Sequence, residues 1–149
     1  IKYLGKYPTT KKKIEEHLHK KVMNKKTYQR AIFPNDISKK DLISGIVDKL
    51  DELKIINEDH YLESLFHYYE KSLFSLRKIK NKLFQKGFDQ KLIEEFISEK
   101  LNENSDLELN ILKKYIERKK LNNLDNVNLK KKLYQQSFAE GSIYKVIKD

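Results

Sequence analysis

The sequence SLRKIKNKLFQKGFDQKLIEEFI, residues 75–97, contains two amphipathic helix patterns with a glycine between them. Ser75 is a preferred N-cap residue, and apolar residues follow it at the three- and four-residue spacing of one helix face. Gly87 favours the left-handed conformation that ends a helix, and Asp89 can cap the next helix. The apolar positions of these two predicted helices are Leu76, Ile79, Leu83, Leu92, Ile93, Phe96 and Ile97.

Similar helix signals run through the rest of the chain, and no segment has the period-two alternation of a strand. Thr10, Ser38 and Asn57 are caps, whereas residues 102–106 and 121–125 are polar connections. We therefore predict an all-α fold of eight helices. The predicted helices cover about 11–24, about 39–53, the segment from the Asn57 cap to Leu73, the segment between Ser75 and Gly87, the segment after Asp89, and about 107–120, 126–136 and 139–148. The predicted apolar residues of the 39–53 helix are Leu42, Ile43, Ile46, Val47 and Leu50.

The apolar positions repeat along the chain at a spacing of 50 residues. Leu62 and Phe66, for example, correspond to Leu112 and Ile116. One helix of the first unit lies 65 residues before its counterpart, which indicates a 15-residue insertion within roughly residues 23–39. We predict three tandem three-helix units that form an elongated, curved array, the first of which lacks most of its opening helix. The predicted units are residues 1–56, 57–103 and 104–149 of one domain that covers residues 1–149.

The composition excludes several classes of protein. Cysteine is absent, which rules out a disulfide framework, a thiolate metal site and a cysteine nucleophile. No apolar run approaches the roughly 20 residues needed to cross a bilayer. Charged residues make up 36% of the chain and the mean hydropathy is −0.78. We expect a soluble, cytoplasmic and monomeric protein that makes no membrane contact.

Positive charge is arranged in blocks. Lysine and arginine number 32 against 22 aspartate and glutamate residues, for a formal net charge of +10. Each predicted unit has an apolar, a basic and a mostly acidic helix, so stacked units place their basic helices along one surface. The net charges are +9 for residues 1–40, −6 for 41–70, +6 for 71–86, −5 for 87–112 and +6 for 113–132.

The cations of the basic helices are the candidate partner-binding residues. When the apolar residues of the 76–86 helix face inward, a rotation of about 100° per residue directs Arg77 and Lys78 outward. Lys80 and Lys82 then lie at the flanks. A solvated lysine face and a surface for an anionic partner fit this pattern equally well. The candidate residues are Lys11, Lys12, Lys13, Arg77, Lys78, Lys80, Lys82, Lys130, Lys131 and Lys132.

Catalytic and metal-binding patterns are not found in the sequence. His17 and His19 are two residues apart on a predicted helix and point in different directions. His60 and His67 have no third ligand at a clear metal-binding spacing. The glycine signatures of nucleotide-binding loops are also absent. We expect no enzymatic activity, no catalytic residue, no metal ion and no cofactor.

Four aromatic residues have two interpretations. Tyr68 and Tyr69 are adjacent, and Phe84 and Tyr134 are related by the 50-residue spacing. Aromatic rings beside lysines can stack on the bases of a single strand. Packing between neighbouring repeats is the favoured interpretation, because apolar rings at helical spacing usually belong to a core.

Two runs of residues resemble the RecX family of RecA regulators. They are Ile56-Asn-Glu-Asp-His-Tyr-Leu-Glu-Ser-Leu65 and Leu76-Arg-Lys-Ile-Lys-Asn-Lys-Leu-Phe-Gln-Lys-Gly-Phe88. The opening Tyr-Leu-Gly-Lys-Tyr-Pro-Thr-Thr, residues 3–10, is similar to the start of that family's common region. The resemblance covers nearly the whole chain, and the Lys-Gly-Phe helix end is its most specific element. The chain departs from the pattern at Asn57, at Ser137 in place of the last glycine, and in the length of its insertion.

This resemblance implies tandem three-helix repeats that associate with RecA filaments on single-stranded DNA. Such proteins usually inhibit recombination, ATP hydrolysis and coprotease activity, and they have no catalytic residues of their own. The expected partner is therefore the RecA filament, with direct DNA contact as a secondary interaction. Two alternatives stay open: an independent basic helical domain that binds DNA or RNA, and a helical scaffold for an acidic partner.

Overall fold

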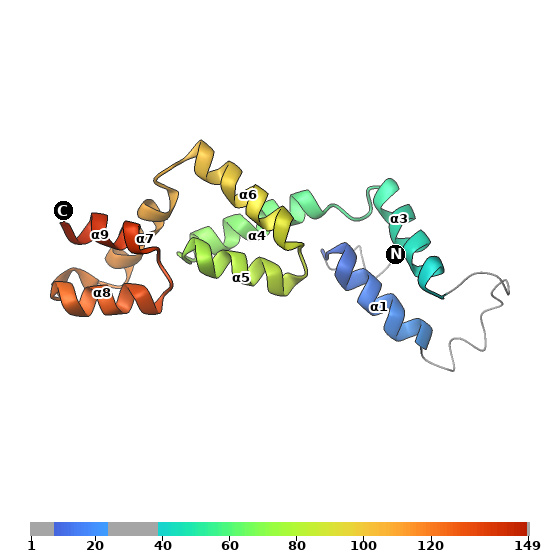
Figure 1. The fold of residues 1–149 in the computed structure, drawn as a ribbon, viewed down its shortest axis with the longest axis horizontal. Coiled ribbons are helices and arrows are strands. Elements are labelled where there is room, and N and C mark those ends of the chain that lie inside the picture. The colour runs from blue at the N-terminus through green and yellow to red at the C-terminus, as the bar shows by residue number, and fades with distance from the viewer. Residues whose placement is uncertain (1–7, 24–38, 149) are drawn as a thin grey trace. The chain divides into compact units, whose positions relative to one another are not determined.

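The computed structural model describes residues 8–23 and 39–148 of the 149-residue chain (Figure 1). The predicted insertion and most of the 3–10 run lie outside these residues. The described part contains eight α-helices, one short 3-10 helix and no strand, which confirms the predicted all-α class. The elements are α1 (Lys11–Met23), α3 (Lys39–Glu52), α4 (Glu58–Lys71), α5 (Leu76–Lys86), α6 (Gln90–Glu103), α7 (Leu107–Arg118), η1 (Leu121–Asn123), α8 (Asn126–Gln135) and α9 (Glu140–Lys148).

The chain divides into two compact units, Ile1–Leu62 and Glu63–Asp149. In the first unit, α1 packs against α3 around a small apolar cluster. Ile46 was expected beside Ile43 on the inner face of α3, but it is 38% exposed, so this prediction is wrong. Ile43 and Val47, predicted on the same helix, are both buried. The cluster consists of Ile14, Ile43, Val47 and Ile56, with Leu18 and Leu50 packed against it.

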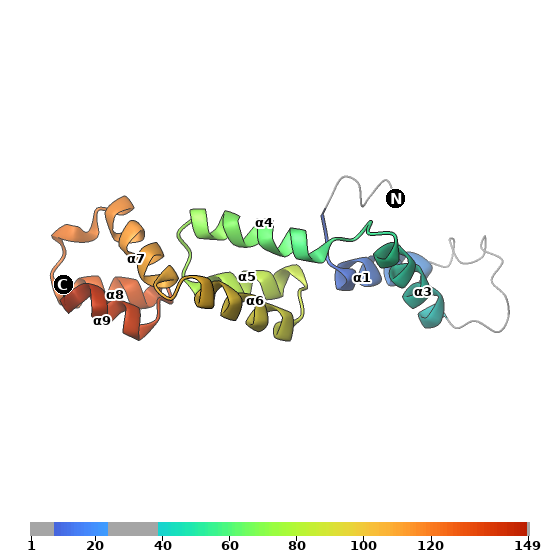
Figure 2. The ribbon, with the colours of Figure 1, turned by 90° about the horizontal axis from the view of Figure 1, so that it is seen from above.

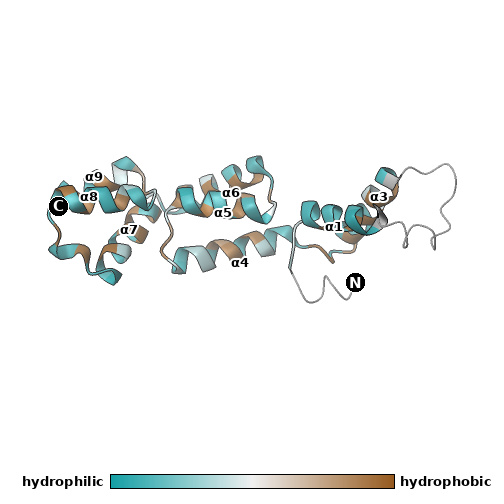
Figure 3. Ribbon diagram, turned by 90° about the horizontal axis from the view of Figure 1, so that it is seen from below, coloured by the Kyte–Doolittle hydropathy of each residue, from teal (hydrophilic) through white to brown (hydrophobic). Residues whose placement is uncertain are grey.

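The second unit has a larger apolar core built from two groups of helices. Helix α5 packs against α6, and both α7 and α8 pack against α9. Phe66 of α4 meets Phe96 of α6 edge to face, with ring centroids 5.3 Å apart. Figure 2 shows α4 on one side of the α5–α6 pair, and Figure 3 shows apolar bands alternating with hydrophilic ones along each helix. The most deeply buried side chains of this unit are Phe66, Ile79, Leu83, Ile97, Leu112, Leu133 and Ile143.

Three helices of the second unit end in the same type of turn, which contains one residue with positive φ. The residues with positive φ are Leu73 after α4 (60°), Gly87 after α5 (99°) and Ser137 after α8 (64°). In each case the N–H of the following residue donates to the carbonyl five positions earlier, at 3.2–3.4 Å. This bonding pattern satisfies the last carbonyls of a helix. The predicted glycine end of the 76–86 helix is confirmed, and Ser137 adopts the same backbone region although it carries a Cβ.

The positive φ of Ser137 leads to a stability prediction. We expect Ser137→Gly to raise the free energy of unfolding by about 1 kcal/mol, because glycine has no steric penalty in the left-handed region. Ser98→Gly, at an exposed position inside α6, is the control and should lower stability by about 0.5 kcal/mol. Denaturant unfolding followed by circular dichroism measures both changes. A loss of stability in both variants would contradict the positive φ at Ser137.

Candidate partner-binding surface

Helix α5 carries four of the predicted cations, and they divide into two pairs. Arg77 and Lys82 are exposed and have no hydrogen bond or ion pair with any described residue. Lys78 is half-buried, and its Nζ donates to Gln136 Oε1 at 2.6 Å. Lys80 is also half-buried, with its Nζ 2.6 Å from Glu94 Oε2. Lys78 was expected to point outward with Arg77, and this prediction is wrong because Lys78 reaches across to the residue that follows α8.

Helix α8 shows the same division. Lys131 and Lys132 are exposed and have no polar partner within the described part of the chain. Lys130 donates to the Tyr144 hydroxyl at 2.7 Å, and its Nζ lies 4.2 Å from the centroid of the same ring. The hydrogen bond to Tyr144 raises the pKa of Lys130. Lys130 therefore links α8 to α9 through a hydrogen bond, and Lys80 links α5 to α6 through an ion pair.

Two of the three predicted cations of α1, which lies in the other unit, form ion pairs. Lys11 Nζ lies 2.7 Å from Asp51 Oδ2, and this hydrogen bond raises the pKa of Lys11. Lys13 Nζ lies 3.2 Å from Glu16 Oε2 on the same helix. Lys12 is exposed. The first turn of α1 is therefore less available to a partner than the charge pattern suggested.

The end of α8 meets the start of α5 within the second unit. The fully buried Ser75 accepts the backbone N–H of Lys78, and its hydroxyl donates to the Gln136 carbonyl at 2.9 Å. Figures 1 and 2 show α5 and α8 lying end to end. The unpaired cations of α5 and α8 are thus carried on two helices that meet end to end within one compact unit.

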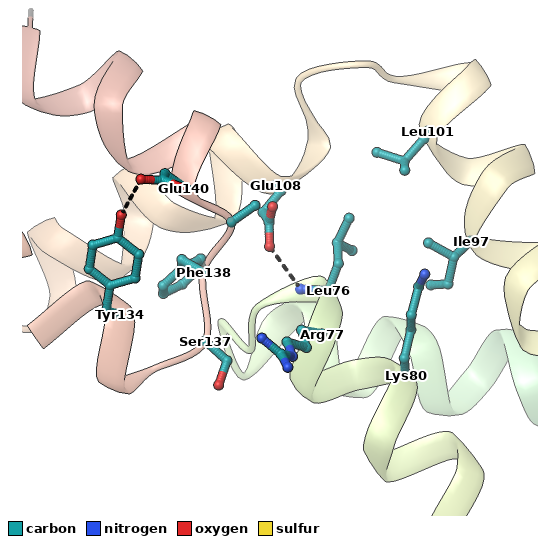
Figure 4. A pocket seen from close by; sticks show the side chains of 11 residues that line it. Leu76, Arg77, Lys80, Ile97, Leu101, Glu108, Tyr134, Ser137, Phe138 and Glu140 are labelled. Carbon is teal, nitrogen blue, oxygen red and sulfur yellow. Dashed lines mark hydrogen bonds between the residues drawn. The ribbon is translucent and has the colours of Figure 1, made fainter.

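A half-buried carboxylate sits beside this junction. Glu108 of α7 accepts the backbone N–H of Leu76 at 3.3 Å, the hydroxyl of Ser142 at 3.4 Å and the backbone N–H of Ala139. Burial raises the pKa of Glu108 above its ordinary value. Figure 4 shows Glu108 directed into a hollow of about 530 Å³. The hollow is lined mainly by Leu76, Arg77, Ile97, Leu101, Tyr134 and Phe138.

The same carboxylate contact occurs in the first unit. Glu58 of α4 accepts the backbone N–H of Lys11, the first residue of α1, at 2.6 Å. Glu58 and Glu108 are related by the 50-residue spacing, and Lys11 and Leu76 by the 65-residue spacing. The fully buried Thr10 accepts the N–H of the residue three positions later, as Ser75 does. The serine and threonine caps were predicted from the sequence, whereas the contacts of the two glutamates were not; the 50-residue spacing between Glu58 and Glu108 was a signal that could have revealed them.

Three aromatic residues are exposed rather than packed between helices. Tyr68 is 65% exposed, Phe84 56% and Tyr134 41%, so the favoured interpretation as core residues is wrong for these three. Tyr69 is buried, as expected of a core residue. The exposed rings lie on the same helices as, or beside, the unpaired cations. This combination of charge and aromatic surface was not assigned from the sequence.

The predicted histidine positions do not converge. His17 is half-buried, and His19, His60 and His67 are exposed. Among the residues that the structure describes, no group of three or more histidine, cysteine, aspartate or glutamate side chains is placed to hold a metal ion. Within the same residues, no helix is both long and apolar enough to cross a membrane.

Glu108 supplies the next prediction. Glu108→Ala removes the acceptor from the first N–H of α5, and we expect the free energy of unfolding at neutral pH to fall by about 1 kcal/mol. Glu108→Gln keeps an acceptor oxygen without the cost of burying a charge, so it should be at least as stable as the parent at neutral pH. Glu99→Gln, on the exposed face of α6, is the matched control and should change little.

The pH dependence tests the same carboxyl group. The pKa of Glu108 is higher in the folded chain than its ordinary value of 4.5, so folding binds its proton more tightly. The parent should therefore lose stability relative to Glu108→Gln as the pH rises from 4.5 through the folded-state pKa. Urea unfolding at several pH values measures this difference. An equal pH dependence in the two proteins would show that Glu108 is not buried in the folded chain.

No family model, curated protein or solved structure matches this chain. A function is therefore inferred from the surface chemistry above and from the resemblance of residues 56–65 and 76–88. The surface is basic, has exposed rings and is built on two helices that meet end to end, which are properties that suit an anionic partner.

Proposed function

We propose that this chain regulates RecA recombinase, most simply as an inhibitor, by binding the RecA filament on single-stranded DNA. It would suppress ATP hydrolysis, strand exchange and coprotease activity, and would do so in the cytoplasm as a monomer. The observation that carries the proposal is the set of unpaired, exposed cations on α5 and α8, helices that meet end to end. The resemblance of residues 56–65 and 76–88 to the RecX family supports a RecA filament as the anionic partner.

The proposal includes three tandem three-helix units in a curved array. Two glutamates at the repeat spacing, Glu58 and Glu108, cap the first N–H of α1 and of α5. The caps Thr10 and Ser75 are both fully buried. These matched contacts support a repeat in which the first helix of each three-helix unit caps the N-terminus of the basic helix in the preceding three-helix unit.

The contact surface is centred on the cations that the fold does not use internally. Arg77 and Lys82 of α5 and Lys131 and Lys132 of α8 meet this condition. Lys78, by contrast, donates a hydrogen bond to the side chain of Gln136. A substitution of Lys78 would therefore lower the stability of the fold as well as the affinity for the partner. An array lying along a filament groove would resist the rearrangements that accompany filament extension and ATP turnover. No group in this surface needs to perform chemistry for that mechanism.

An independent DNA- or RNA-binding domain is the second candidate function. The observation that favours it is the exposure of Tyr68 beside the unpaired Lys82 and of Tyr134 beside the unpaired Arg77. Such a domain would bind naked nucleic acid strongly and with steep salt dependence, and would need no protein partner. A filament regulator would bind naked DNA more weakly and act when RecA is present.

The first functional test is the ATP hydrolysis of RecA on single-stranded DNA, titrated with this protein. We expect hydrolysis to be lost well below one copy per RecA, because a protein bound along the filament affects several subunits. Naked-DNA binding must be measured at the same salt, so that sequestration of the template is excluded. No effect up to equimolar protein would refute the inhibitory function and favour the second candidate.

Charge reversal tests the surface. We expect Arg77→Glu combined with Lys131→Glu to weaken filament binding by at least tenfold, about 1.4 kcal/mol, without unfolding the chain. A glutamate in the first turn of α5 agrees with the helix dipole, so the fold should tolerate it. Lys113→Glu with Lys114→Glu, exposed on α7, makes the same charge change elsewhere. Equal loss in both double variants would show that net charge, and not this surface, controls binding.

A further inference from the structure

We propose that a hollow between α4 and α5 binds one nucleotide of a single-stranded nucleic acid. The hollow has a volume of about 460 Å³ and lies wholly within the second unit. It shares Lys82 with the partner surface above, and three aromatic rings form one of its walls. Its lining residues are Tyr68, Tyr69, Phe74, Lys82, Gln85 and Lys86.

The three rings offer a stacking platform. Tyr68 is 65% exposed, so a face of its ring is open to a ligand. The ring of Tyr69 packs edge to face against the ring of Tyr68, with the two centroids 5.5 Å apart and the ring planes at 64°. Phe74 stacks on Tyr69 at 5.8 Å with planes only 16° apart. An unpaired nucleobase can stack on an exposed ring of this kind, which is held in place by the other two rings.

The backbone around these rings is held in place. The hydroxyl of Ser72 donates to the Tyr68 carbonyl at 2.8 Å, and the N–H of Phe74 donates to the Tyr69 carbonyl at 3.2 Å. Leu73 makes the turn with a φ of 60°. Lys78 Nζ lies 5.8 Å from the centroid of Phe74. The platform is therefore formed before any ligand arrives, which reduces the ordering cost of binding.

The polar wall of the hollow is entirely positive or neutral. Lys82 and Lys86 are four residues apart on α5, which places them on one side of the helix, and no carboxylate lines the hollow. Lys82 has no polar partner among the described residues. Gln85 lies between them and can both donate and accept hydrogen bonds at a base edge. A ring to stack on and two cations for phosphate match a nucleotide better than they match an apolar helix.

The repeat itself does not require these rings. The positions 50 residues after Tyr68, Tyr69 and Phe74 are Arg118, Lys119 and Leu124. A core position would keep its apolar character at that spacing, as Phe88 and Phe138 do. The exposed ring of Tyr68 is therefore particular to one group of helices, which is expected of a binding site, whereas the position of Phe74 stays apolar in Leu124 and Tyr69 is a buried core residue.

The site goes beyond the proposed regulation of RecA and can be tested without it. The intact chain is titrated into an end-labelled oligothymidylate, with no recombinase present, and binding is followed by fluorescence anisotropy over a range of salt concentrations. Tyr68→Ala should weaken binding by about 5-fold or more, while Tyr68→Phe, which keeps the ring, should bind as the parent does. Phe84→Ala removes a similarly exposed ring outside the hollow and should have little effect.

Lys82 provides an independent readout. Lys82→Gln should reduce the slope of log affinity against log salt by roughly 0.7, the value for one phosphate contact on a single strand. Lys113→Gln, an exposed lysine on α7, should leave the slope unchanged. Thermal unfolding of each variant confirms that the fold is retained.

Several results would overturn the site. If the oligothymidylate does not bind, the hollow is not a nucleotide site, and its cations would then fit a different ligand such as an acidic peptide. Equal affinity of Tyr68→Ala and the parent, or an equal loss in Phe84→Ala, would show that binding is spread over the basic surface. Strand binding through the hollow together with unchanged RecA hydrolysis would refute the proposed function alone, so the two failures can be told apart.

Discussion

Two of the basic helices, α1 and α5, depend on carboxylates that other helices bring to their N-termini. Neither α1 nor α5 has an acidic residue in its first turn, and the cations there oppose the helix dipole. Glu58 and Glu108 accept the first backbone N–H of α1 and α5 respectively. The buried Thr10 and Ser75 satisfy a second N–H in each case. A helix can therefore present cations to solvent because another helix stabilises its start.

This arrangement separates lysines that hold the fold from lysines that are available to a partner. Lys80 and Lys130 each connect a basic helix to the helix that follows it, through Glu94 and Tyr144 respectively. Arg77 and Lys82 of α5 and Lys131 and Lys132 of α8 have no polar partner among the described residues. A surface built in this way combines positional order with free charge, and both are needed to bind a regular polyanion such as a nucleoprotein filament.

Aromatic exposure adds a second kind of chemistry to the charge. Tyr68 of α4 lies beside the lysines of α5. Its ring packs against the ring of Tyr69, which stacks on Phe74. Electrostatic attraction to phosphate acts over distance and weakens with salt, whereas stacking acts only in contact and is largely insensitive to salt. A strand or filament drawn in by the cations would thus meet a site with a defined geometry.

The sequence by itself determined the helices and the residues that end them. Caps such as Ser75 and turns such as Gly87 act through bonds within a few residues, so local patterns predict them. Only the tertiary structure decided which cations are free, because Lys78 is paired with Gln136, which lies more than 30 residues away in the sequence. The contact of Glu108 with the N–H of Leu76 also joins residues more than 30 positions apart. It likewise decided that Tyr68 is open to solvent while Tyr69 is buried, although the two are adjacent. Burial and pairing depend on what the neighbouring helices bring, and helical periodicity alone carries no information about those neighbours.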